Sequence, residues 1–113
     1  MLTVEKRLID PDLAVLALAG RLTLGRECQQ VEWQLEDLLR EGKLKVILDL
    51  SGLTYIDSAG VGIVAMCFGK LNKSGGTLRV AGATGYVEET LRMTHLHEVI
   101  QLFPTVEAAA ESL

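Results

Sequence analysis

The chain has 113 residues, 49% of them hydrophobic and only 4% aromatic, with a formal net charge of −4 and a pI near 5.1. This length suits one domain with a core of aliphatic side chains, and we expect that domain to span residues 1–113. The acidic balance and the lack of a Lys or Arg cluster argue against a nucleic-acid partner. The longest apolar stretch, residues 13–19, is far short of the roughly 20 residues of a membrane span, and no cleavable signal precedes it. We therefore expect a cytoplasmic protein without a membrane partner.

Two strands are predicted at the N-terminus. Apolar and polar residues alternate from Leu2 to Leu8, which predicts a strand with one wet face at the edge of a sheet. The Asp-Pro-Asp sequence at 10–12 predicts a turn, and the apolar run 13–19 predicts a second strand, deeper in the sheet and antiparallel to the first. We expect Gly20 to end this strand.

An amphipathic helix is predicted over residues 24–40. Glu32, Glu36 and Arg40 lie outside its apolar stripe, which consists of Leu24, Cys28, Val31, Leu35, Leu38 and Leu39. Gly42 fits the position that follows the end of a helix. Trp33 falls off the stripe, so we expect it to cover an edge of the helix, with a partner contact as the alternative.

The stretch from residue 45 to residue 62 is the expected centre of the fold. The apolar run 46–50, interrupted only by Asp49, is typical of a strand that is covered on both faces of a parallel sheet. We expect residues 51–54 to break this strand. Asp57 and Ser58 are good N-cap residues for a helix over about 58–73, whose apolar positions are Val61, Val64, Ala65, Phe68 and Leu71.

The remaining segments alternate between strands and helices. They predict a strand at 77–81, a short strand at 99–102, a final helix capped by Thr105, and a helix at 86–94 with an apolar side of Tyr86, Val87, Leu91 and Met93. Together the elements predict an α/β fold, with a mixed, mostly parallel sheet, an antiparallel N-terminal edge strand and about four helices. Cys28 and Cys67 fall in separate helices without a C-x-x-C pair, so we expect free thiols.

Ser58 is the candidate site of modification. The small residues Ala59, Gly60 and Gly62 in the first turn of its helix expose backbone N–H groups at the positive end of the helix dipole and let another surface approach closely. A phosphate on Ser58 is favoured there, and it would add a charge of about −1.5 to −2 beside Asp57 and repel a docked partner. The simpler alternative is that both residues only cap the helix.

Four segments carry a family resemblance. They are Gly-Arg-Leu at 20–22, DSAGVG at 57–62, Gly-Gly-Thr-Leu at 75–78 and Phe-Pro-Thr at 103–105. As a set, they resemble the STAS family, which comprises the bacterial anti-sigma factor antagonists and their relatives, over essentially the whole chain. The resemblance implies that a partner kinase phosphorylates Ser58 and that the small residues after it form the docking surface.

The resemblance also implies a binding partner. The unmodified chain would bind an anti-sigma factor of the serine-kinase type, and phosphorylation would block that binding, so that the sigma factor is released only in the first state. Segments 21–25 and 56–62 both follow strand ends, so we expect them to be neighbours. The expected partner-binding residues are Arg21, Thr23, Gly25, Ile56, Asp57, Ala59, Gly60, Val61 and Gly62. Thr23 departs from the acidic residue that is usual in the family. No cofactor is implied, and a weak homodimer is left open.

Three other functions are weighed against this one. An enzyme with Ser58 as nucleophile lacks a G-x-S-x-G elbow and an evident base, so we expect no enzymatic activity. His95 and His97 have the spacing of a metal site on a strand, but no cysteine or paired carboxylate completes it, and a loop with two exposed histidines is the better interpretation. A STAS subunit of another assembly, such as a lipid-transport or stress-signalling complex, shares the fold and stays open.

Overall fold

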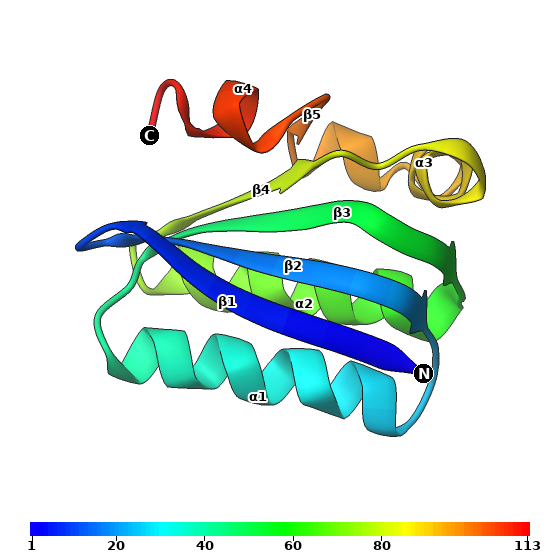
Figure 1. The fold of residues 1–113 in the computed structure, drawn as a ribbon, viewed down its shortest axis with the longest axis horizontal. Helices are drawn as coiled ribbons and strands as arrows, with labels where there is room; N and C mark the ends of the chain where they lie inside the picture. Colours follow the sequence, from blue (N-terminus) through cyan, green and yellow to red (C-terminus); the bar gives the residue numbers. More distant parts are fainter.

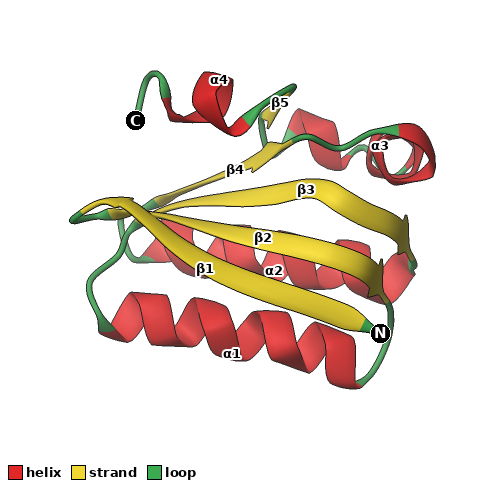
Figure 2. Ribbon diagram, viewed as in Figure 1, coloured by secondary structure: helices red, strands yellow, loops and turns green.

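The computed structural model describes all 113 residues as one five-stranded sheet with helices packed on it (Figures 1 and 2). The strands lie side by side in chain order: β1 (Leu2–Asp10), β2 (Leu13–Leu22), β3 (Lys45–Ile56), β4 (Thr77–Ala81) and β5 (Leu102–Phe103). β1 is antiparallel to β2, and the other pairs are parallel. This confirms the predicted α/β fold with a mixed sheet and an antiparallel edge strand.

Four α-helices and one short 3-10 helix connect the strands. They are α1 (Arg26–Arg40), α2 (Ser58–Lys73), α3 (Gly85–Met93), η1 (Leu96–Glu98) and α4 (Val106–Ala110). α1 and α2 lie next to each other on one face of the sheet, and α4 packs over β3 and β4 on the other face (Figure 1). None of these helices combines the length and apolar character that a membrane crossing requires.

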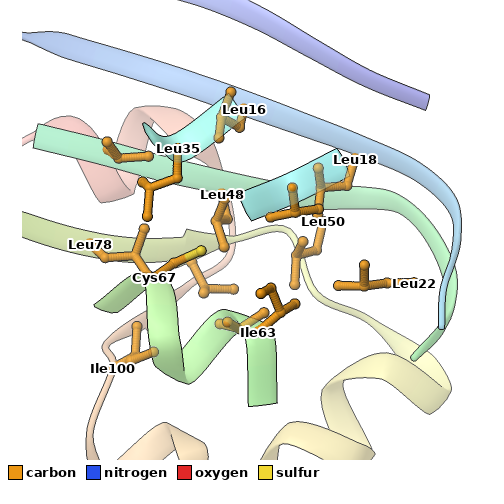
Figure 3. Packing of buried hydrophobic residues seen from close by; sticks show 14 of the residues in the cluster. Leu16, Leu18, Leu22, Leu35, Leu48, Leu50, Ile63, Cys67, Leu78 and Ile100 are labelled. Atoms are coloured by element: carbon orange, nitrogen blue, oxygen red, sulfur yellow. The ribbon is translucent and has the colours of Figure 1, made fainter. Parts of the chain in front are cut away.

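The main core lies between the sheet and α1 and α2. Alternate strand residues such as Leu16, Leu48 and Leu78 are fully buried there against side chains such as Leu35 and Cys67 (Figure 3). Each such leucine stabilises the fold by about 1.5–3 kcal/mol through its burial. The opposite face holds a smaller cluster, made of Leu13, Val15, Ile47, Ala81 and Ala109. Because α4 is short, much of that face over β1 and β2 stays open.

β3 is longer than the sequence indicated. The prediction that residues 51–54 break the strand was wrong, because β3 continues to Ile56 and β2 continues past Gly20 to Leu22. The register between the two strands shifts along this stretch, which is the mark of β-bulges. At Gly52 an added Cβ would lie 3.0 Å from the Cβ of Ala19, so this glycine allows a close approach of the two strands rather than a turn.

Other boundaries also differ from the prediction. α1 begins at Arg26, so Leu24 does not belong to its buried stripe and is 77% exposed. Gly25, with φ at +107°, is the N-cap residue that sets this start. The last strand was predicted at 99–102, but that segment follows η1 and only residues 102–103 pair with β4.

The helix α3 buries fewer residues than predicted. Val87 and Leu91 are fully buried, as expected, whereas Tyr86 and Met93 are 51% and 73% exposed. The helix packs against β3, which extends beyond its last partner on β4 at Asp49. α3 therefore shields the part of β3 that leads to the candidate site.

Both cysteines are free thiols, as predicted. Cys67 is fully buried in α2, and burial raises its pKa to about 12. Cys28 is half-buried in α1, its pKa is raised mainly by burial and further by the charge of Asp57, and its Sγ donates to the carbonyl oxygen of Thr23 at 3.2 Å. These surroundings suit structural cysteines rather than reactive ones.

Candidate functional site

The start of α2 is tied to the end of β2 by Asp57. The Asp57 carboxylate accepts a hydrogen bond from the Gly60 backbone N–H at 2.8 Å, which caps α2, and another from the Leu24 N–H at 3.0 Å. The Asp57 N–H in turn donates to the carbonyl oxygen of Leu22 at 3.2 Å. The expectation that segments 21–25 and 56–62 are neighbours is therefore confirmed.

Asp57 is held in its ionised form. Partial burial would by itself raise the pKa of Asp57, but the backbone N–H groups of Gly60, Leu24 and Ala59 outweigh that effect and lower the pKa. Asp57 therefore uses N–H groups that we had expected to remain free for a phosphate. A phosphate on the neighbouring Ser58 would have to share the helix start with a carboxylate that is already negative.

Gly60 serves the interior of the protein. It is buried, and an added Cβ would lie 2.6 Å from the carbonyl oxygen of Leu22 and 2.7 Å from Cγ1 of Ile56, both closer than real Cβ atoms approach. The expectation that this glycine exposes the helix start to a partner was wrong. Its lack of a side chain instead lets α2 pack directly on the ends of β2 and β3.

The outer side of α2 carries a row of small, exposed residues. Ser58, Gly62, Ala65 and Gly69 recur at spacings of four and three and form what we call the Ser58 face. Neither Gly62 nor Gly69 has an atom within 4 Å of the place where a Cβ would lie. The prediction that Ala65 belongs to the apolar side of the helix was wrong, and Ile63 and Cys67 fill the core instead.

The expected partner-binding residues divide into two groups by exposure. Ile56 is fully buried and Val61 is 9% exposed, so their side chains lie beneath the surface together with Gly60. Ala59 and Thr23 are half-buried, and Gly25 is exposed next to Leu24, whose N–H donates to the Asp57 carboxylate. The structure thus brings the loop of residues 23–25, between β2 and α1, and the start of α2 to one surface.

Arg21 lies on the other face of the sheet. It alternates with the buried Leu22, and its guanidinium carbon lies 4.2 Å from the ring centroid of Tyr55. Tyr55 in turn stacks on Tyr86 with centroids 5.2 Å apart. The sheet separates Arg21 from the Ser58 face, so the structure does not unite this residue with the others.

Two residues that the sequence placed on the apolar sides of helices, Leu24 and Tyr86, are exposed. Leu24 looked like a core residue of the first helix, but it projects from the loop whose N–H group Asp57 holds. Gly25 is the signal that could have placed Leu24 outside the helix. Tyr86 likewise follows a glycine at the start of α3 and stacks on Tyr55.

The two histidines lie at the start of η1 and within it. His95 adopts a left-handed conformation with φ at 61°, and its Nδ1 lies 3.1 Å from a carboxylate oxygen of Glu98. The rings of His95 and His97 stack with centroids 6.2 Å apart. Neither histidine forms a hydrogen bond with Ser58.

The chain also matches a known protein family in sequence. The model of the STAS domain matches residues 6–109. The chain belongs to the STAS domain family. A Thermotoga maritima protein named "Putative anti-sigma factor antagonist" is 27% identical over 82 residues, which cover 73% of each chain.

Solved structures show that this STAS chain has the fold of several named relatives. A crystal structure of a Thermotoga maritima protein with the same designation superposes with a TM-score of 0.88 at 24% identity, covering 96% of this chain and 92% of that one. The anti-sigma factor antagonist SpoIIAA, in its unphosphorylated form, gives a TM-score of 0.77 at 18% identity and covers 97% of this chain and 96% of its own. SpoIIAA of Bacillus has also been solved in its phosphorylated form.

Proposed function

We propose that this chain is an anti-sigma factor antagonist that binds a serine-kinase anti-sigma factor through the Ser58 face. Phosphorylation of Ser58 by that kinase then ends the binding. The sigma factor is therefore released, in the cytoplasm, only while the chain is unphosphorylated. The exposure of Ser58 next to the ionised Asp57, at one end of a row of small residues, carries the proposal. Two of the named relatives are described as anti-sigma factor antagonists, which supports it.

The Ser58 face suits close contact with another protein. Because Gly62 and Gly69 carry no side chain, a partner surface can approach the α2 backbone directly. The half-buried Ala59 and the exposed Leu24 extend the contact toward the loop before α1. Aliphatic groups and exposed backbone of this kind favour a dry interface that tolerates few charges.

Phosphorylation would change the charge of this surface. A phosphate adds a charge of about −1.5 to −2 at Ser58. This charge lies beside the carboxylate of Asp57, which is itself negative because its pKa is lowered. Like charges brought together in an interface cost several kcal/mol. We therefore expect phosphorylation to weaken partner binding by about 100-fold or more.

The proposal assigns different roles to the remaining site residues. Thr23 and Gly25 contact the partner from the loop that Asp57 holds in place. Ile56, Gly60 and Val61 support the surface from beneath, since they are buried. These assignments predict that a substitution of the half-buried Thr23 weakens binding without loss of stability, whereas a substitution of Gly25 also costs stability because its backbone has φ at +107°.

A kinase reaction tests the proposal. The chain is incubated with ATP and a serine-kinase anti-sigma factor, and the phosphorylated residue is located by mass spectrometry. We expect phosphate on Ser58 and none in the Ser58→Ala variant, while the exposed Ser51 and Ser74 stay unmodified in both. Phosphate on Ser51 or Ser74 in place of Ser58 would contradict the proposal. Co-purification with a transporter ATPase instead of an anti-sigma factor would favour the alternative of a STAS subunit in a transport complex.

A further inference from the structure

The outer edge of β1 offers unpaired backbone groups. β1 pairs with β2 on one side only, and it is the first strand in the order of the sheet. The Arg21 N–H donates to the carbonyl oxygen of Met1, so the odd-numbered residues of β1 direct their backbone groups toward β2. The N–H and C=O groups of Val4, Lys6 and Leu8 therefore point outward.

Only the beginning of this edge is occupied. Gln30 on α1 donates from Nε2 to the carbonyl oxygen of Leu2 at 3.3 Å. Farther along, Leu8 and Ile9 are 51% and 45% exposed, which is high for aliphatic side chains of a strand. The free stretch from residue 4 to residue 8 is long enough to hydrogen-bond to another strand.

The side chains of β1 are complementary to a second copy of β1. In an antiparallel pair with Lys6 opposite Lys6 of the second copy, the outward-pointing backbone groups of Val4 face those of Leu8. The same register places Glu5 opposite Arg7 of the second copy, twice by symmetry, on the open face of the sheet. A pairing shifted by two residues would instead oppose Glu5 to Glu5 or Arg7 to Arg7.

We propose that a second copy of this chain binds along β1, in this register, and forms a two-fold dimer with a continuous sheet. Charged residues on an edge strand ordinarily discourage pairing. In this register they favour it, because both charge pairs at Glu5 and Arg7 are attractive. The opposed Lys6 side chains are the unfavourable element, and the Glu41 carboxylate, 3.6 Å from the Lys6 ammonium, offsets their repulsion.

Sedimentation equilibrium of the full chain tests the dimer. We expect the apparent mass to rise from 12.3 kDa toward twice that value between micromolar and millimolar concentrations. Dissociation should increase when the salt concentration rises from about 50 mM to about 500 mM, because the charge pairs are exposed. A mass of 12.3 kDa at every concentration would overturn the proposal.

Charge exchange identifies the register. Glu5→Arg and Arg7→Glu each turn two attractive pairs into repulsive ones, so each should weaken the dimer by about tenfold. The double variant restores opposite charges and should return the dissociation constant to within about threefold of the original value. A dimer that is insensitive to the single changes, or a double variant as weak as either one, would contradict this register.

Backbone substitution at Lys6 provides a second test. Lys6→Pro removes an outward N–H that β2 does not use, so it should abolish the dimer while a thermal melt shows that the chain still folds. Lys6→Ala keeps this N–H and serves as the matched control, with the dimer retained. If Lys6→Pro is folded and still dimeric, the copies associate through another surface and the proposal is wrong.

Discussion

Replacing Gly60 by alanine tests whether this glycine is required by internal packing. The new Cβ would meet the Leu22 carbonyl oxygen at 2.6 Å and Cγ1 of Ile56 at 2.7 Å. The Leu22 oxygen cannot move freely, because it is a backbone atom that accepts from the Asp57 N–H. Overpacking costs about 1–3 kcal/mol, and this contact falls in the upper part of that range, about 2–3 kcal/mol, because a fixed backbone atom opposes the new Cβ. The better helix propensity of alanine returns about 1 kcal/mol. We expect the free energy of unfolding to fall by about 1–2 kcal/mol.

Gly62 is the matched control on the same helix, since nothing lies within 4 Å of its added Cβ. Gly62→Ala should gain up to about 1 kcal/mol from helix propensity. Thermal unfolding followed by circular dichroism should show a Tm about 5 °C lower for Gly60→Ala than for the original chain. The Tm of Gly62→Ala should be unchanged or higher. A Gly60→Ala variant as stable as the original chain, or a Gly62→Ala variant that loses as much, would refute the packing argument.

Two further predictions concern Asp57 and the cysteines. Asp57→Ala removes the cap of α2 and the tie to Leu24, so the free energy of unfolding in urea should fall by about 1–2 kcal/mol, and by less in Asp57→Asn. Because folding lowers the pKa of Asp57, the stabilisation that its charge provides is present above the ordinary pKa of 3.8 and is lost as the pH falls below that value. A difference between Asp57→Ala and the original chain that is as large in strong acid as at pH 7 would speak against this account. A thiol reagent at about pH 8 should modify the half-buried Cys28 well before the buried Cys67, and equal labelling rates, read by mass spectrometry, would contradict the packing of α2.

The sequence predicted the fold where local signals and burial agree. The apolar run before Asp49, the capping residues Asp57 and Ser58 and the row of core residues after them all favour the same strand and helix. The neighbourhood of the two loops followed from the rule that parallel strands end at one edge of a sheet. These parts depend on patterns within a short stretch of chain, which the sequence displays directly.

The errors arose where a contact distant in the sequence decides the structure. Gly52 looked like a strand breaker, but Ala19 on β2 makes it part of a bulged strand. Gly60 looked like an exposed residue because nothing in its own segment shows that Leu22 lies against it. Arg21 was expected beside Ser58, but β2 continues to Leu22 through its pairing with β3, so Arg21 alternates with the buried Leu22 and lies on the opposite face. Pairing register and close backbone contacts of this kind are not encoded in local periodicity.

The binding of a serine-kinase anti-sigma factor to a Ser58→Glu variant tests the central claim most directly. Isothermal titration calorimetry should show that Ser58→Glu binds about 100-fold more weakly than the original chain, because the added charge lies in the interface beside Asp57. Ser58→Ala and Ser74→Glu should bind as tightly as the original, since the first adds no charge and the second places it at the other end of α2. A Ser58→Glu variant that binds with unchanged affinity would contradict the proposal that charge at Ser58 controls docking.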